Sequence, residues 1–108
     1  MGLNTSKLDP LSERLIDFLA RRASNKSIDI DRLRVVTGSS IAKISLEAIE
    51  TIAKEVSRLE GASVYCNICW KGPFTKKGMY LHLTRLHKYE LKNMLIHELR
   101  EKILKSSY

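Results

Sequence analysis

The amino-acid sequence predicts a mainly helical chain with one small β-hairpin, an α+β fold. Apolar side chains recur every three or four residues along most of the 108 residues, which is the spacing of one buried helix face. Residues 64–74 interrupt this spacing and are predicted to form the hairpin. The apolar fraction of 44% and the charged fraction of 29% are typical of a globular domain.

Residues 1–61 are predicted to form a unit of three helices. Asp9 suits the N-cap of the first helix, and Pro10 suits its first helical position. Asp29 suits the N-cap of the second helix, and Gly38 stands where that helix would end. The three helices are expected at residues 9–22, 30–37 and 41–59.

Two further segments, residues 62–88 and 89–108, complete the predicted domain organisation. Their expected elements are the hairpin at residues 64–74, a helix at 76–87 and an amphipathic helix at 89–105. The boundary after the first unit lies near Gly61 and is too short to be a flexible linker.

Positive charge is concentrated in the C-terminal half of the chain. Residues 1–61 carry ten Lys/Arg and nine Asp/Glu, whereas residues 62–108 carry nine Lys/Arg and three Glu. The two balances are therefore +1 and +6, which sum to the total of +7. A basic half favours nucleic acid or another polyanion as partner, and a merely well-charged surface is the alternative.

The sequence favours an intracellular, cytoplasmic protein with no membrane partner. The N-terminus lacks the apolar segment of a secretory signal, and no apolar run is long enough to cross a membrane. In a reducing compartment a cysteine pair is expected to bind metal rather than to form a disulfide. The chain has no glutamine and many charged residues, a composition toward which thermophilic proteins tend.

Both cysteines and two of the three histidines follow the spacing Cys66-x2-Cys69-x12-His82-x4-His87, where x is any residue. A two-residue gap lets a tight turn aim both sulfurs at one point. A four-residue gap places both imidazoles on one face of a helix. Two thiolates and two imidazoles suit tetrahedral Zn²⁺, so the sequence predicts one zinc ion per chain.

With these four ligands, residues 64–88 resemble the C2H2 zinc finger family, which implies a ββα fold around a structural zinc. Met79 stands where the family usually has Leu, and Phe74 is the expected core aromatic. Phe74 comes one residue later than is usual, because Pro73 holds the usual place. The resemblance covers about a quarter of the chain, and its spacing is specific.

No catalytic constellation accompanies the predicted zinc site. Four protein ligands close the coordination sphere, whereas a catalytic zinc keeps one position open for water. His97 is the only other histidine, and it falls on the polar side of the tail helix. We therefore expect neither enzymatic activity nor a small-molecule substrate.

The side chains around the finger favour contacts to phosphate over contacts to bases. The family reads bases from positions that here hold Thr75, Gly78 and Leu81. Gly78 and Leu81 offer no hydrogen bond, and a single finger covers only about three base pairs. The basic side chains expected to contact phosphates are Lys71, Lys76, Lys77, Arg85 and Lys88.

Residues 29–56 resemble the second and third helices of archaeal winged-helix regulators of the helix-turn-helix type. The Thr37-Gly38 turn and the core positions Leu33 and Val36 carry this resemblance. It implies that the third helix enters the major groove of DNA. Exposed acidic residues on that helix argue against its insertion into the major groove. The alternative is a plain helical bundle that packs on the finger.

The tail helix carries a continuous apolar ladder of Leu91, Leu95, Leu99 and Ile103. Residues four apart lie on one side of a helix, so the ladder is either internal core or the seam of a two-fold homodimer. Lys92 on the same side would limit such a seam to a narrow contact.

These observations together predict a small DNA-binding protein with one structural zinc finger, of the transcription-regulator class, whose partner is double-stranded DNA. Two alternatives come from other classes. One is a protein-interaction or assembly module that uses the finger and the tail helix. The other is a basic protein associated with RNA or the ribosome.

Overall fold

The computed structural model of the chain describes residues 5–106, which form five helices and one two-stranded antiparallel hairpin. The elements are α1 (Thr5–Ala23), α2 (Ile30–Thr37), α3 (Ser39–Val56), β1 (Ser57–Glu60), β2 (Ser63–Cys66), α4 (Lys76–Leu86) and α5 (Lys88–Ser106). The mainly helical α+β class predicted from the sequence is confirmed. Within the described residues, no helix has the length and apolar character needed to cross a membrane.

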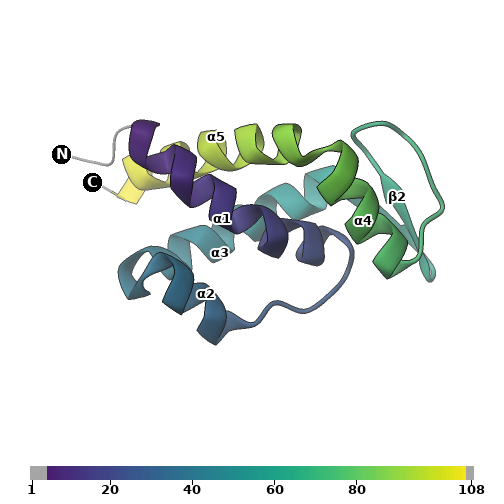
Figure 1. Ribbon diagram of the computed structural model, residues 1–108, viewed down its shortest axis with the longest axis horizontal. Helices are drawn as coiled ribbons and strands as arrows, with labels where there is room; N and C mark the ends of the chain where they lie inside the picture. Colours follow the sequence, from purple (N-terminus) through teal and green to yellow (C-terminus); the bar gives the residue numbers. More distant parts are fainter. Residues whose placement is uncertain (1–4, 107–108) are drawn as a thin grey trace.

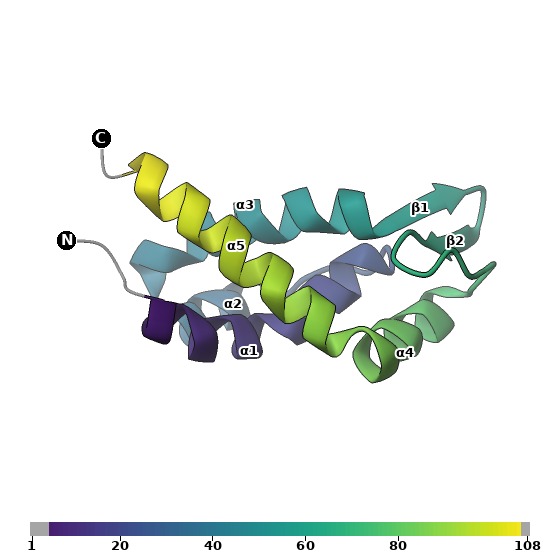
Figure 2. The same ribbon diagram turned by 90° about the horizontal axis from the view of Figure 1, so that it is seen from above.

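Three long helices, α1, α3 and α5, pack against one another along a body of 44 × 26 × 23 Å (Figure 1). The short helix α2 lies against α3 and the flank of α1. The hairpin and α4 form one end of the body, and the start of α1 and the end of α5 lie at the other (Figure 2). The Cys/His segment therefore closes one end of a helical bundle.

One cluster of buried apolar side chains joins residues from all five helices and β2. Its largest fully buried members are Leu8, Leu15, Leu19, Leu33, Ile49, Ile52, Val56, Met79, Leu83, Leu91, Leu95 and Leu99. Met79 and Leu83 of α4 belong to the same cluster as the leucines of α1 and α5, so α4 shares its core with the bundle. The three predicted segments, 1–61, 62–88 and 89–108, all contribute to it.

Helix α1 begins earlier than the sequence predicted. It starts at Thr5 and contains Pro10, which was expected at the first helical position. Leu8 is 1% exposed and belongs to the core with Leu15, so the chain must already be helical at Leu8 to bury it. A proline in the second turn of a helix removes only one backbone hydrogen bond, and this burial offsets the loss.

The second helix follows the prediction closely. The Asp29 side chain accepts a hydrogen bond from the backbone N–H of Arg32 at 3.1 Å, as an N-cap does. Gly38 ends α2 with a φ of 87°, a conformation that glycine adopts without strain. Since α3 starts at Ser39, Gly38 alone joins the two helices. The helix-turn-helix interpretation of this pair stays a prediction.

The hairpin lies earlier in the chain than predicted, because α3 ends at Val56 rather than near Leu59. Its strands pair from Ser57 opposite Cys66 to Glu60 opposite Ser63, so the predicted boundary near Gly61 is the turn of the hairpin. The side chain of Asn67 binds the carbonyl of Glu55, and its backbone N–H binds that of Val56 at 2.7 Å; both bonds help end α3. Part of the predicted pairing remains, as Val64 and Phe74 exchange two backbone hydrogen bonds.

The apolar ladder of the tail helix is internal core. Leu91, Leu95 and Leu99 are each fully buried where α5 packs on α1 and α3, and Ile103 is half-buried at the edge of the same cluster. In this structure Leu91, Leu95 and Leu99 are therefore covered by the bundle and cannot form a dimer seam, whereas Ile103 is only half-buried; a homodimer through another surface stays a prediction. Lys92, expected to narrow such a seam, instead forms ion pairs with two carboxylates of α1.

Candidate metal centre

The fold brings together all four predicted metal ligands. Cys66 ends β2, Cys69 lies in the turn that follows, His82 is in α4, and His87 is the residue after α4. Their ligand atoms all lie within 4.8 Å of one another. Cys69 Sγ lies 3.3 Å from His82 Nε2, and in a tetrahedral zinc site a sulfur and a nitrogen ligand are about 3.5 Å apart.

A tight turn of the backbone presents the two cysteines. The N–H of Trp70 donates to the carbonyl of Cys66, and the N–H of Cys66 donates to the carbonyl of Lys71, both at 2.9 Å. Burial raises the pKa of the Cys66 thiol, while hydrogen bonds from the N–H groups of Cys69 and Ile68 act against that rise by favouring the thiolate. A divalent cation would displace the thiol proton and balance the buried charge.

The two histidines are buried and held from several sides. The ring of His82 stacks on Phe74, with centroids 4.6 Å apart, and meets His87 edge-on. This arrangement gives Phe74 the core position expected of it. Burial, then the neighbouring charges of His87 and Lys71, lower the pKa of His82, which favours the neutral imidazole that binds metal.

His87 offers the site a ring nitrogen that could hold an ion. Its Nδ1 lies 3.4 Å from a carboxylate oxygen of Glu90, which can orient the ring as outer carboxylates do for metal-bound histidines. Its Nε2 is buried and has no hydrogen-bond partner among the described residues. A buried ring nitrogen without a partner is costly, and coordination to a cation would satisfy it.

Gly72 lets the loop after the cysteines close against β2. Its φ is 147°, and a Cβ built there would lie 2.7 Å from Cδ1 of Tyr65 and 3.2 Å from the Cα of that residue. The second distance involves backbone, which cannot move aside. No local sequence pattern singles out this glycine, because the contact depends on the folded loop.

We expect Gly72→Ala to destabilise the protein by about 1–3 kcal/mol, since it adds a steric clash to an unfavourable φ. The control is Gly61→Ala in the hairpin turn, where φ is 64° and an added Cβ meets nothing within 4 Å. That change should cost only the backbone strain, about 1 kcal/mol. Denaturant unfolding of the metal-loaded proteins measures both, and equal losses would contradict the role assigned to Gly72.

All five basic residues predicted to contact phosphates are exposed around this end of the molecule. They are Lys71, Lys76, Lys77, Arg85 and Lys88. Lys88 differs from the others because its Nζ lies 3.7 Å from a carboxylate oxygen of Glu13. Within residues 5–106, none of the other four forms an ion pair with a carboxylate.

The three positions from which the zinc finger family reads bases hold few side-chain groups here that could bind a base. Thr75 is the N-cap of α4, and its Oγ1 accepts a hydrogen bond from the N–H of Gly78 at 3.0 Å. An added Cβ on Gly78 would lie 3.1 Å from that same oxygen. Leu81 is half-buried and apolar. The hydroxyl of Thr75, the one hydroxyl among these three residues, is therefore already engaged as the N-cap of α4.

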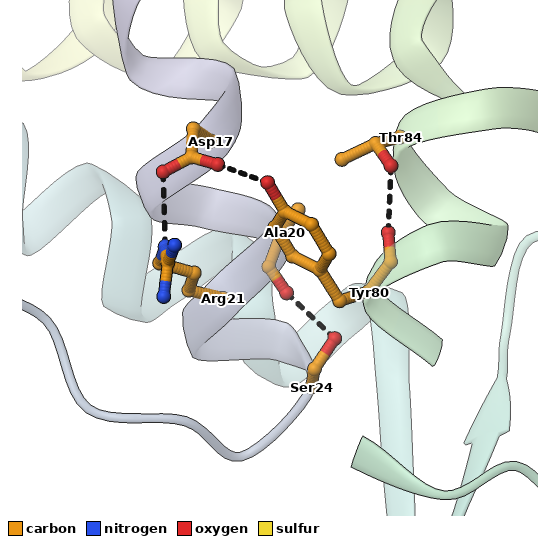
Figure 3. Close-up of polar contacts among 6 residues, drawn as sticks. All are labelled: Asp17, Ala20, Arg21, Ser24, Tyr80 and Thr84. Carbon is orange, nitrogen blue, oxygen red and sulfur yellow. Dashed lines mark hydrogen bonds and ion pairs between the residues drawn. The ribbon is translucent and has the colours of Figure 1, made fainter. Parts of the chain in front are cut away.

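Sequence reasoning missed the polar contact that joins α4 to α1 (Figure 3). The hydroxyl of Tyr80 donates a hydrogen bond to Asp17 Oδ1, and Arg21 Nε donates to Asp17 Oδ2 at 3.0 Å. Burial would raise the pKa of Asp17, but these two hydrogen bonds outweigh it and lower that pKa. The partners are 63 positions apart, and no local pattern marks a surface tyrosine for such a role.

Comparison of the chain with protein-family models, with curated proteins and with solved structures finds no match. The class of the site therefore rests on its own geometry. It is a closed Cys2His2 cluster that can hold a metal ion between a hairpin, a loop and a helix.

Proposed function

We propose that this chain is a DNA-binding protein in which one Zn²⁺ has a structural role. The ion would be held by Cys66, Cys69, His82 and His87. Two thiolates and two imidazoles suit the borderline softness and tetrahedral preference of zinc. The buried, unpartnered Nε2 of His87 supports metal binding. Four protein ligands leave no position for substrate or water, which supports an architectural role.

One observation carries the proposal of nucleic-acid binding. Lys71, Lys76, Lys77 and Arg85 are exposed around the metal centre, and none has a carboxylate partner within the described residues. Unpaired lysines and arginines on a rigid unit suit the phosphates of a duplex, because their charge replaces condensed counterions. Lys88 is a weaker member of this set, since Glu13 offsets its charge.

The finger is proposed to grip the duplex rather than to read its bases. Thr75 is engaged as an N-cap, Gly78 has no side chain, and Leu81 can offer at most an apolar contact to a thymine methyl. Regulation of transcription is the finer proposal, and its sequence preference would have to come from another part of the chain. The exposed Lys43, Glu47 and Lys54 of α3 are candidates under the helix-turn-helix resemblance.

We expect Lys76→Ala combined with Lys77→Ala to weaken binding to all duplexes by similar factors. Each lost phosphate contact should lower the slope of log K against log salt by about 0.9. Leu81→Ala should leave the preference among bases unchanged. Both variants are to be measured on the best duplex selected from a random pool, on its single-base variants and on random DNA.

The control is Lys102→Ala combined with Lys105→Ala, which removes the same charge near the C-terminal end of α5, at the opposite end of the body (Figure 2). A variant that relaxes preference at one base position, while its random-DNA binding stays constant, would show that the finger reads sequence. A metal-loaded wild type without affinity for any duplex would contradict the DNA proposal. Preference for single strands or structured RNA would favour an RNA-associated protein instead.

A protein-interaction module is the second candidate, and two exposed apolar side chains favour it. Trp70 is 74% exposed and has a φ of 64°, and Leu86, at the end of α4, is 64% exposed. Tryptophan is among the residues that most often dominate protein interfaces. Absence of nucleic-acid affinity, together with loss of a protein partner in Trp70→Ala, would favour this candidate.

A further inference from the structure

Two cations of the N-terminal half lie beside the helix of the finger. The guanidinium of Arg21 and the ammonium of Lys26 each lie 5.4 Å from the centre of the Tyr80 ring. Tyr80 belongs to α4, one turn after Lys76, and its hydroxyl is bound to Asp17 of α1 (Figure 3). The flank of α4 is thus continuous with the C-terminal end of α1 and the loop that follows it.

Two more arginines extend this surface along α1 and α2. Arg14 and Arg32 line a shallow hollow together with Asp17, Phe18 and Val35. Neither arginine forms an ion pair with a carboxylate in the part of the chain that the structure describes. The carboxylate of Asp17 pairs with Arg21 and also feels the charge of Arg32, so this one carboxylate serves more than one of the surrounding cations.

Within residues 5–106, most acidic side chains of the N-terminal half form ion pairs, and only Asp17, Asp29 and Asp31 lie beside members of the basic surface. Asp9 and Glu13 pair with Lys92 on the flank of α1 that faces α5. Three other carboxylates pair locally or with a neighbouring helix, in the pairs Glu50–Arg22, Asp31–Arg34 and Glu60–Arg58. A segment whose formal charge sums to +1 therefore carries a distinctly basic surface next to α4.

We propose that this surface, the α1–α2 basic band formed by Arg14, Arg21, Lys26 and Arg32, is a second phosphate-binding surface for the same nucleic acid. It rests on the proposed function, since it extends the surface by which the finger would hold a duplex. The band compensates for the small footprint of one finger, because further phosphate contacts add affinity without adding base recognition. The matching partner is the phosphate backbone of double-stranded DNA.

The test uses the metal-loaded chain of 108 residues and its double variant Lys26→Gln with Arg32→Gln. Arg21 stays in place because it helps to hold the junction of α1 and α4 through Asp17. We expect the slope of log K against log salt on a random duplex to fall by about two units, at about 0.9 for each lost contact. The affinity should fall for every duplex sequence alike.

The control is Lys102→Gln with Lys105→Gln, an equal loss of charge near the C-terminal end of α5 at the far end of the body (Figure 2), and it should leave the salt slope unchanged. Equal metal content and equal melting temperature establish that both variants are folded. If the band variant keeps the wild-type slope while Lys76→Ala with Lys77→Ala lowers it, the band is not a phosphate surface and the proposed function still stands. If the wild type binds no duplex, the proposed function itself fails, and the band fails with it.

Discussion

Removal of the metal is expected to unfold β2, the loop after it and α4, while α1, α3 and α5 remain helical. Structural zinc sites of this kind contribute about 10–16 kcal/mol of binding free energy near neutral pH, and that energy appears as folding energy. Without an ion, the site leaves a buried ring nitrogen of His87 unpartnered and a buried thiol at Cys66. The bundle keeps its own core of leucines from α1 and α5.

The expected loss extends beyond the metal-binding segment, because Met79 and Leu83 of α4 belong to the core cluster that the bundle shares. Unfolding of α4 would expose both side chains and the leucines against which they pack. We therefore expect chelation to lower the melting temperature of the bundle as well. Hydrogen exchange should show full loss of protection in residues 64–87 and a smaller loss in α1 and α5.

Cys69→Ser and His87→Ala should reproduce the effect of a chelator, whereas His97→Ala should not. His97 is exposed on α5 and serves as the matched control for loss of an imidazole. Native mass spectrometry should find one Zn²⁺ on the wild type and on the control variant, and none on the two ligand variants. A wild type that carries no metal, or a ligand variant that keeps it with unchanged stability, would contradict the metal centre.

The sequence predicted the four ligands, because zinc chemistry fixes both the residue types and their spacing. The helices were also predictable from apolar spacing, and Asp29 and Gly38 marked the ends of α2 correctly. The hairpin was misplaced because β1 follows α3 without a break, and local propensity does not say where a helix gives way to a strand. Asn67, which helps end α3, lies well beyond it in the chain and carries no local signal.

Other features arise only from tertiary packing. The early start of α1 depends on the burial of Leu8 against residues distant in sequence. The bond between Tyr80 and Asp17, and the pairing of Asp9 and Glu13 with Lys92 on the flank of α1 that faces α5, cannot be read from net charge. From the sequence, the apolar ladder of the tail helix could be either internal core or a dimer interface. In the structure α1 and α3 pack on that face of α5, which no local pattern predicts.

Replacement of a ladder leucine by glutamate is expected to unfold much of the chain rather than to release monomers from a dimer. Leu95 and Leu99 are fully buried between α5, α1 and α3. Truncation of such a leucine to alanine costs about 2–5 kcal/mol, and a buried carboxylate without a partner costs more. Since small domains are stable by only about 5–15 kcal/mol, Leu95→Glu should leave little folded protein.

The matched control is Leu104→Glu, on the same helix but 54% exposed, which should change stability by less than about 0.5 kcal/mol. Denaturant unfolding measures the loss, and sedimentation of each protein gives its oligomeric state. The two roles of the ladder predict opposite results. If Leu95 is a core residue, the substitution lowers the free energy of unfolding. If Leu95 lies in a dimer seam, the substitution separates the two chains and leaves that free energy unchanged. A dimeric wild type that Leu95→Glu converts to a monomer of undiminished stability would show that α5 does not pack on α1 and α3 in solution as it does in this structure.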